Sequence, residues 1–294
     1  MPERTLGGVY VANVTPFKED GTLTVDEGAY LEHVAWLSER GVRGVVPFGT
    51  NGEGPSVAMQ EKLRVLEALF DGAPTLQIIP SVMQGNLPDT LRMIEALNGH
   101  PAASVLVLPP YYFKPADAEG LKRFYEPVME ASEHPVVAYH IPKYAVPIPT
   151  EVVGSLPFWG VKDSGGEPGY AEAVLRAGKG VLVGTEDDVR SRVGIGAQGA
   201  ISALANFVPD EVVALYESAL SGDEAGGEAL AGALLEARAK TKEHSSPAVL
   251  KRLAQERHGV PMGTVRPPFV PLPQDYDAAE VLRIARVAGT GGAA

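Results

Sequence analysis

The stretch "PVVAYHIPKYAVPIPTEVVGSLPFWGVKD", residues 135–163, holds one full repeat of the pattern that decides the fold. It begins with an apolar run at 135–141, continues through a helical pattern that opens at Pro149 and Thr150, and ends with a second apolar run at 158–163. Both runs are nearly continuous rather than alternating, which is typical of strands that are covered on both faces. A strand, a helix and a strand in this order predict a parallel sheet beneath helices.

The same pattern recurs along the chain as far as about position 220. Eight apolar runs have the character of strands, and they lie at 9–15, 44–49, 76–82, 104–111, 135–141, 158–163, 180–185 and 199–204. Amphipathic stretches such as 25–40 and 59–70 separate them at helical spacing. Eight such units predict an α/β fold of the (β/α)8 TIM barrel type. A doubly wound open sheet uses the same alternation, but the first strand here lacks the glycine fingerprint of that fold.

The remainder of the chain is also helical in pattern, with stretches at 226–244, 246–259 and 276–286. The sequence therefore predicts a barrel over residues 1–222, with its active site at the C-terminal face, and a C-terminal helical extension over 223–294. We expect the final "AGTGGAA" to be a disordered tail, because small residues at a terminus have little to pack against.

Composition excludes several classes of function. The formal net charge is −12, which argues against binding to nucleic acid or to an anionic membrane. There is no cysteine, so disulfides and thiol catalysis are excluded, and a reducing compartment is favoured. We find neither a signal peptide at the N-terminus nor an apolar run of about 18 residues. The sequence thus predicts a soluble cytoplasmic protein.

Two motifs that could indicate a cofactor or a metal do not have the required context. The segment "GIGAQG" (194–199) fits G-x-G-x-x-G, but it precedes a predicted strand, whereas a dinucleotide site needs it after one. The six histidines have no metal-binding spacing. We therefore expect no metal and no cofactor.

Reactive side chains gather at the predicted C-terminal ends of the strands, where barrel enzymes place their active sites. Lys162 and Tyr139 lie near the ends of two apolar runs, and the glycine-rich "GTNGEG" (49–54) follows a third. A desolvated lysine loses its proton more easily and can attack a ketone to give an imine, which activates the neighbouring carbon. A tyrosine can shuttle protons there, and exposed backbone amides suit a carboxylate. Each feature alone has a structural explanation, but together they favour catalysis.

Several separated motifs carry a resemblance to a known family. They are "VTPF" (14–17), "GTNGE" (49–53), "PPYY" (109–112), "YHIP" (139–142), "GVKDS" (160–164), "GAISALAN" (199–206) and "GTVRPP" (263–268). With these motifs the chain resembles the dihydrodipicolinate synthase / N-acetylneuraminate lyase family of Schiff-base-forming barrel enzymes over nearly its whole length.

The resemblance implies catalytic roles for four residues. Lys162 would form the Schiff base with the 2-oxo group of pyruvate, and Tyr139 would relay protons beside the imine. Thr50 would pass protons between Tyr139 and Tyr112, where Tyr112 reaches in from a neighbouring subunit. A shared tyrosine implies a homo-oligomer, either a dimer or a tetramer.

The resemblance also implies substrate contacts. Thr50 and Asn51 would hold the pyruvate carboxylate, and Gly184 and Ile201 would line the pocket. The expected partners are thus a small 2-oxo acid, pyruvate, and an aldehyde.

Two departures from the family pattern bear on the second substrate. Asn51 replaces the second threonine of the usual loop, as in members that act on 4-hydroxy-2-oxoglutarate. Tyr144 stands where dihydrodipicolinate synthases usually carry an arginine, and a phenol cannot form the bidentate pair that arginine makes with a carboxylate. The neighbouring Lys143 could supply only a point charge.

We therefore expect a class I, lysine-dependent aldolase or lyase that acts on a 2-oxo acid of the 4-hydroxy-2-oxoglutarate or 2-keto-3-deoxy sugar acid type. One alternative is dihydrodipicolinate synthase, which condenses pyruvate with aspartate semialdehyde, and a sugar-acid dehydratase is another. A non-catalytic barrel that binds a 2-oxo acid is the alternative from a different class, although it has no need of a proton relay.

Overall fold

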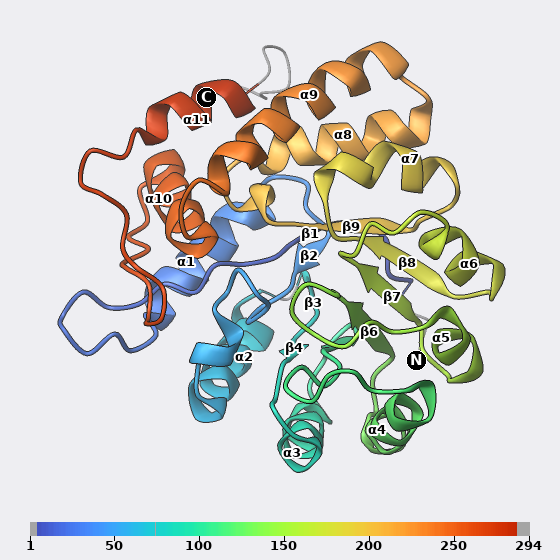
Figure 1. Ribbon diagram of the computed structural model, residues 1–294. Helices are drawn as coiled ribbons and strands as arrows, with labels where there is room; N and C mark the ends of the chain where they lie inside the picture. Colours follow the sequence, from blue (N-terminus) through green and yellow to red (C-terminus); the bar gives the residue numbers. More distant parts are fainter. Residues whose placement is uncertain (1–4, 74, 287–294) are drawn as a thin grey trace.

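The computed structural model describes residues 5–73 and 75–286, and its strands form one parallel sheet surrounded by helices (Figure 1). The strand order is β3-β2-β1-β9-β8-β7-β6-β5-β4. The strands are β1 (Gly8–Val11), β2 (Gly44–Val45), β3 (Gln77–Ile78), β4 (Ser81–Val82), β5 (Val105–Val107), β6 (Val136–His140), β7 (Gly160–Asp163), β8 (Gly180–Val183) and β9 (Gly199–Ser202).

The sheet closes into a barrel because β3 and β4 are two halves of one extended segment. Pro80, which has no N–H to donate, separates them. The N–H of Ile79 donates to Val45 O at 2.9 Å on one side, and the N–H of Leu106 donates to Pro80 O at 2.9 Å on the other. Residues 77–82 therefore bond to β2 and to β5, and nine segments make the eight strands of a closed barrel. The prediction of a (β/α)8 barrel is confirmed.

The helices follow the predicted alternation, and most bounds agree with the sequence patterns within a few residues. They are α1 (Glu27–Ser38), α2 (Met59–Gly72), α3 (Leu87–Leu97), α4 (Ala118–Ala131), α5 (Thr150–Ser155), α6 (Tyr170–Arg176), α7 (Val189–Gly194), α8 (Pro209–Ser221), α9 (Glu224–Thr241), α10 (Ser246–His258) and α11 (Ala278–Ala285), with single turns η1 (Gly54–Ser56), η2 (Glu186–Asp188) and η3 (Leu204–Asn206). Within the described residues, no helix combines the length and the apolar character that a membrane span requires.

The core has two parts, one inside the barrel and one between the sheet and the helices. Tyr10, Leu182 and Ile201 belong to the inner cluster. The outer cluster includes Leu234 of α9 and Leu253 of α10, together with residues of the barrel helices. The predicted C-terminal extension thus buries its apolar side chains in the same core as the barrel, and Figure 1 shows it beside α1 and α8.

The turn between α8 and α9 falls at the predicted boundary of residues 222 and 223. The tail at 288–294, which the sequence predicts to be disordered, lies outside the described residues.

Candidate active site

Lys162 and Tyr139 lie side by side on neighbouring strands. They are register partners in the pairing of β7 with β6. Both are buried, with exposed fractions of 4% and 3%, and Tyr139 belongs to the cluster inside the barrel. The Lys162 ammonium nitrogen is 4.3 Å from the centre of the Tyr139 ring. The strand register alone therefore brings an amine and a phenol together inside the barrel.

Thr50 joins this pair from the loop that follows β2. Its hydroxyl oxygen is 3.2 Å from the Tyr139 hydroxyl, within hydrogen-bonding distance. The structure thus brings together three of the residues that the sequence singles out, in the spatial order Lys162, Tyr139, Thr50. A proton can pass between the two hydroxyls without leaving the site.

The loop that carries Thr50 has an unusual backbone. Phe48 and Glu53, which flank residues 49–52, have φ angles of +59° and +53°, in the left-handed region that non-glycine residues rarely adopt. At Gly54 a Cβ atom would clash with the carbonyl oxygen of Phe48, so only glycine fits there. Strained residues of this kind persist where the surrounding structure holds them, and they often mark functional sites.

A buried ion pair holds the far end of this loop. The Glu53 carboxylate lies 2.6 Å from the ammonium of Lys251 on α10, and both side chains are fully buried. Lys251 also donates to Thr264 O at 2.7 Å, and Glu53 accepts the backbone N–H of Arg266 at 2.9 Å. Burial lowers the pKa of Lys251 to about 8, against the opposing effect of the Glu53 charge. The loop is thus fixed to the C-terminal part of the chain.

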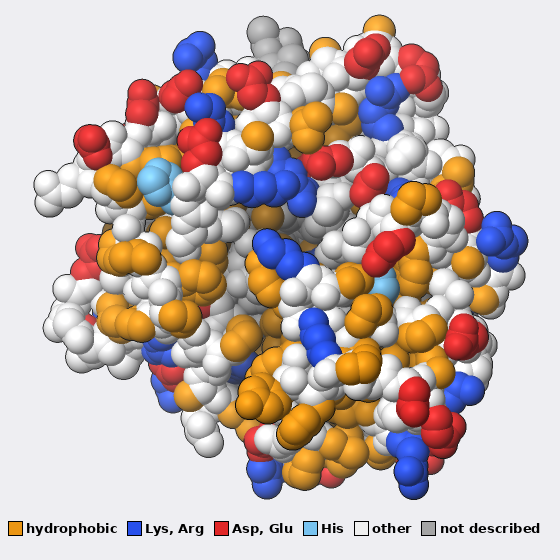
Figure 2. All heavy atoms as spheres, viewed as in Figure 1, with side chains coloured by type: hydrophobic (Ala, Val, Ile, Leu, Met, Phe, Trp, Pro, Cys, Tyr) orange, Lys and Arg blue, Asp and Glu red, His pale blue; other side chains and the backbone are white. Residues whose placement is uncertain are grey.

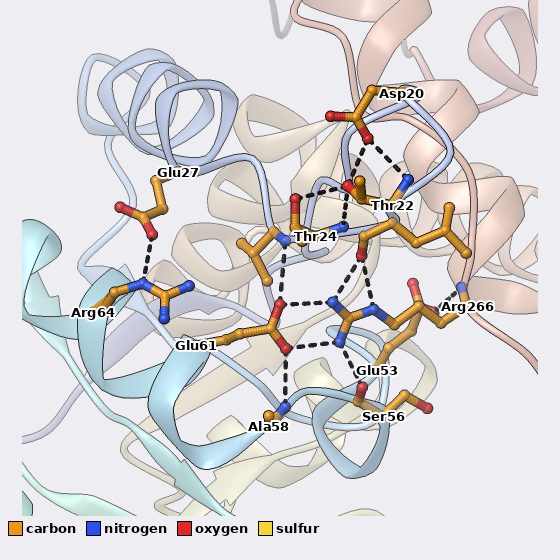
Figure 3. A network of polar contacts seen from close by, with 12 residues as sticks. Asp20, Thr22, Thr24, Glu27, Glu53, Ser56, Ala58, Glu61, Arg64 and Arg266 are labelled. Atoms are coloured by element: carbon orange, nitrogen blue, oxygen red, sulfur yellow. Dashed lines mark hydrogen bonds and ion pairs between the residues drawn. The ribbon is translucent and has the colours of Figure 1, made fainter.

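Arg266 extends this connection toward the N-terminus, as Figure 3 shows. Its guanidinium donates to both carboxylate oxygens of Glu61 on α2, at 2.7 and 2.9 Å. It also donates to Leu23 O and Ser56 O. The hydrogen bond from Arg266 is the main cause that lowers the pKa of Glu61. One side chain therefore connects the segment after α10 to Leu23, to Ser56 and to Glu61 of α2.

Sequence reasoning missed Glu53, Lys251 and Arg266 as residues that shape the site. Glu53 lies in the motif "GTNGE" and Arg266 in "GTVRPP", so the family motifs marked both positions. The sequence alone, however, assigned no role to either residue. Lys251 lies in a helical pattern in which a lysine usually faces water, so nothing local distinguished it.

A cavity of about 350 Å³ lies beside Thr50, which forms part of its wall. Its apolar lining includes Met83, Leu108, Tyr111, Ile141, Tyr144 and Phe269, and Glu53 and Ser56 also line it. Figure 2 shows hydrophobic side chains gathered on this face, over α3, α4 and the loop after β6. The cavity is predominantly apolar.

The other predicted site residues are placed differently. Tyr112 is 81% exposed and packs edge-on against Phe113, so it does not enter the site of its own chain. The Asn51 side-chain oxygen accepts a hydrogen bond from Ser246 of α10 at 3.3 Å, which directs it toward that helix. Gly184 follows β8 and donates to Asp163 O at 2.7 Å, and Ile201 on β9 is buried inside the barrel.

His140 lies on the opposite face of β6 from Tyr139, as alternation along a strand predicts. It stacks on Tyr170, and its Nδ1 accepts the N–H of Ile148 at 3.2 Å. Its Nε2 therefore carries the proton and donates to Glu167 at 3.1 Å. His140, Asp163 and Glu167 lie close enough to bind a cation together, but the protonated Nε2 offers no lone pair to a metal. This cluster fits a structural role behind the sheet.

Comparison with known proteins identifies the family. The chain matches the Dihydrodipicolinate synthetase family over residues 5–285. The chain belongs to this family. It is therefore an enzyme of the lyase and aldolase type, as the resemblance implied.

Two relatives in the dihydrodipicolinate synthetase family are similar to this chain over nearly its whole length but carry different enzyme names. An uncharacterized DapA-like lyase of Chloroflexus aurantiacus is 30% identical over 92% of this chain and 94% of its own. A 4-hydroxy-tetrahydrodipicolinate synthase of Thermomicrobium roseum is 31% identical over 91% of this chain and 90% of its own. A crystal structure of dihydrodipicolinate synthase covers 95% of this chain and 96% of its own, with 27% identity and a TM-score of 0.85.

Proposed function

We propose that this enzyme is a class I aldolase that forms a Schiff base between Lys162 and pyruvate. The observation that carries the proposal is the row formed by the buried Lys162 and Tyr139 and the half-buried Thr50, in which an amine, a phenol and a hydroxyl lie next to one another. A barrel that only bound a 2-oxo acid would need a carboxylate site but no such relay, which disfavours the non-catalytic alternative.

The reaction begins with attack of the Lys162 amine on the C2 carbonyl of a 4-hydroxy-2-oxo acid. Water leaves with a proton from Tyr139, and a protonated imine remains. The Tyr139 oxygen then accepts the proton of the C4 hydroxyl, the C3–C4 bond breaks, and its electrons enter the imine to form an enamine. An aldehyde is released. Protonation at C3 and addition of water then release pyruvate and restore the amine, and the reverse sequence forms the bond.

The substrate carboxylate binds to the loop at residues 49–52. Thr50 can use its hydroxyl for the relay and its backbone N–H for the carboxylate. The backbone N–H of Asn51 is a second donor, since its side chain is directed toward Ser246. We assign Gly184, which directly follows β8, and Ile201 of β9 to the wall around the pyruvate, because β8 pairs with the strand that carries Lys162 and β9 pairs with β8. No metal or cofactor has a role in this scheme.

We further propose that the protein acts as a homo-oligomer, a dimer or a tetramer, in the cytoplasm. Tyr112 packs edge-on against Phe113, and both are exposed to solvent; such exposed aromatic side chains favour burial at an interface. In that assembly Tyr112 would complete the relay of the partner subunit through Thr50.

Borohydride trapping tests the Schiff base directly. The protein is incubated with pyruvate, reduced and digested, and the modified peptide is identified by mass spectrometry. We expect the adduct on Lys162, no adduct and no turnover in Lys162→Ala, and an unchanged adduct in Lys143→Ala, which alters an exposed lysine after β6. A folded protein that binds pyruvate but gives no adduct would instead support the binding barrel.

The named relatives support a second candidate, dihydrodipicolinate synthase, whose second substrate is aspartate semialdehyde. Tyr144, in place of the usual arginine, lines the cavity and offers no charge to the carboxylate of that substrate. The aldolase is therefore the better-supported function.

A further inference from the structure

We propose that the aldehyde partner of this enzyme carries an uncharged, apolar group of about the size of an aromatic ring. This inference rests on the proposed function, because it concerns the substrate that meets the pyruvate enamine.

The cavity that shares Thr50 with the relay is the place for that group. Met83, Leu108 and Ile141 are buried and form its inner wall. Tyr111, Tyr144 and Phe269 are less buried and form the outer part. These side chains come from loops after three strands and from the segment after α10, so the chain builds the apolar wall from independent parts.

The charge distribution excludes an anionic group. Glu53 is the charged residue among those that line the cavity in the described parts of the chain, and its carboxylate is already paired with Lys251. A carboxylate or phosphate that entered here would lose its hydration and meet no free cation, which is strongly unfavourable.

The two lysines closest in sequence to the cavity wall do not change this conclusion. Lys143 is exposed, and its ammonium lies 5.0 Å from the centre of the Tyr144 ring. Lys114 is exposed and donates to Pro142 O at 3.4 Å. Neither is among the residues that line the cavity.

The size of the cavity agrees with an aromatic group. An apolar cavity of about 150 Å³ accommodates benzene. The cavity of the single chain is about 350 Å³, more than twice that volume, and Thr50 in its wall connects it through Tyr139 to Lys162. The hydroxyls of Thr50 and Ser56 lie at its edge and can bind the aldehyde oxygen or a phenolic substituent.

The test measures carbon–carbon bond formation between pyruvate and three aldehydes: benzaldehyde, glyceraldehyde and aspartate semialdehyde. We expect kcat/KM for benzaldehyde to exceed the values for the other two by at least roughly 10-fold, because one buried apolar group commonly accounts for such a ratio. In Tyr144→Arg, kcat/KM for aspartate semialdehyde should rise and that for benzaldehyde should fall. The matched variant Tyr144→Phe keeps the apolar wall and should retain the preference for benzaldehyde.

Borohydride trapping in the same samples distinguishes a failure of this inference about the aldehyde from a failure of the proposed aldolase function. If pyruvate is trapped on Lys162 but a charged or polyhydroxylated aldehyde is the better substrate, this inference is wrong and the aldolase remains. If Tyr144→Arg leaves the preference unchanged, the cavity does not select the aldehyde, and the inference is also wrong. Absence of any adduct would remove the aldolase and this inference with it.

Discussion

At the scale of single residues, the positions of Lys162 and Tyr139 follow from a property of strands. Both face the barrel interior, and they are register partners on adjacent strands, so their side chains meet without any contribution from a loop. Alternation along β6 then sends His140 to the other face, where it stacks on Tyr170. The contact between Lys162 and Tyr139 is thus set by the strand period and by the register of β6 with β7.

Replacement of Tyr139 by phenylalanine tests the relay. Tyr139→Phe keeps the ring beside Lys162 and removes the hydroxyl that contacts Thr50, so we expect kcat to fall by roughly 10²-fold or more. Stopped-flow or steady-state turnover measures the loss, and circular dichroism checks the fold. Tyr10→Phe is the matched control, since Tyr10 is also buried inside the barrel but bonds Gln77. Equal rates in wild type and Tyr139→Phe would make Tyr139 a packing residue.

At the scale of elements, the loop at 49–54 depends on α10 and on the segment that follows it. Glu53 holds a left-handed conformation at the end of this loop, and its carboxylate meets Lys251 and the N–H of Arg266. The position of Thr50 relative to Tyr139 is therefore fixed by residues about 200 positions further along the chain. This arrangement gives the C-terminal helices a direct part in the site.

Removal of the Lys251 charge should be costly because Glu53 would remain buried without a partner. We expect Lys251→Met to lower the free energy of unfolding by about 3–5 kcal/mol, measured by urea denaturation. The double variant Glu53→Gln with Lys251→Met should recover part of the loss, since no buried charge is then left. Arg252→Met is the control, because its neighbouring ion pair with Glu256 is exposed and contributes little. A loss in Lys251→Met no larger than in Arg252→Met would contradict the role of the pair.

At the scale of the whole molecule, a chain of hydrogen bonds runs from the end of α10 to Ala12, directly after β1. The N–H of Val260 donates to His258 Nδ1 at 3.2 Å, and His258 Nε2 lies 3.0 Å from His33 Nδ1. His33 Nε2 lies 3.1 Å from Asn206 Oδ1, and the Asn206 amide donates to Ala12 O at 2.9 Å. Every hydrogen bond in this series has one donor and one acceptor when both histidines are neutral, because each ring then donates from Nε2 and accepts at Nδ1.

Stability should therefore depend on pH below the ordinary histidine range. Burial lowers the pKa of His33 to about 3 and that of His258 to about 4, from 6.5 in the unfolded chain. Below pH 6.5 both histidines bind protons in the unfolded state but remain largely neutral in the folded state. The free energy of unfolding should therefore fall as the pH decreases toward 4. Above pH 6.5 these groups should contribute no pH dependence. Urea unfolding across this range measures the slope, and His33→Gln should have a shallower one. Parallel slopes would show that the histidines do not contribute.

Much of the fold and the centre of the site could be predicted from the sequence. The eight strand–helix units, the ends of most helices and the inward positions of Lys162 and Tyr139 follow from local periodicity, which a linear sequence records directly. Thr50 lies in the glycine-rich loop that follows a strand end, and the family resemblance implied its role. The membership in the family followed from motifs of the same local kind.

Only the tertiary structure decided how distant segments complete the site. Sequence patterns do not show that Lys251 neutralises Glu53, that Phe269 reaches the cavity, or that His258 meets His33. They also do not show that Asn51 turns toward Ser246. Such contacts depend on where the chain returns after the barrel has closed, and that position is set by the packing of all helices together. The sequence thus determined the barrel and the inward position of Lys162, whereas the packing of the C-terminal segment helped to decide the shape and polarity of the pocket beside Thr50.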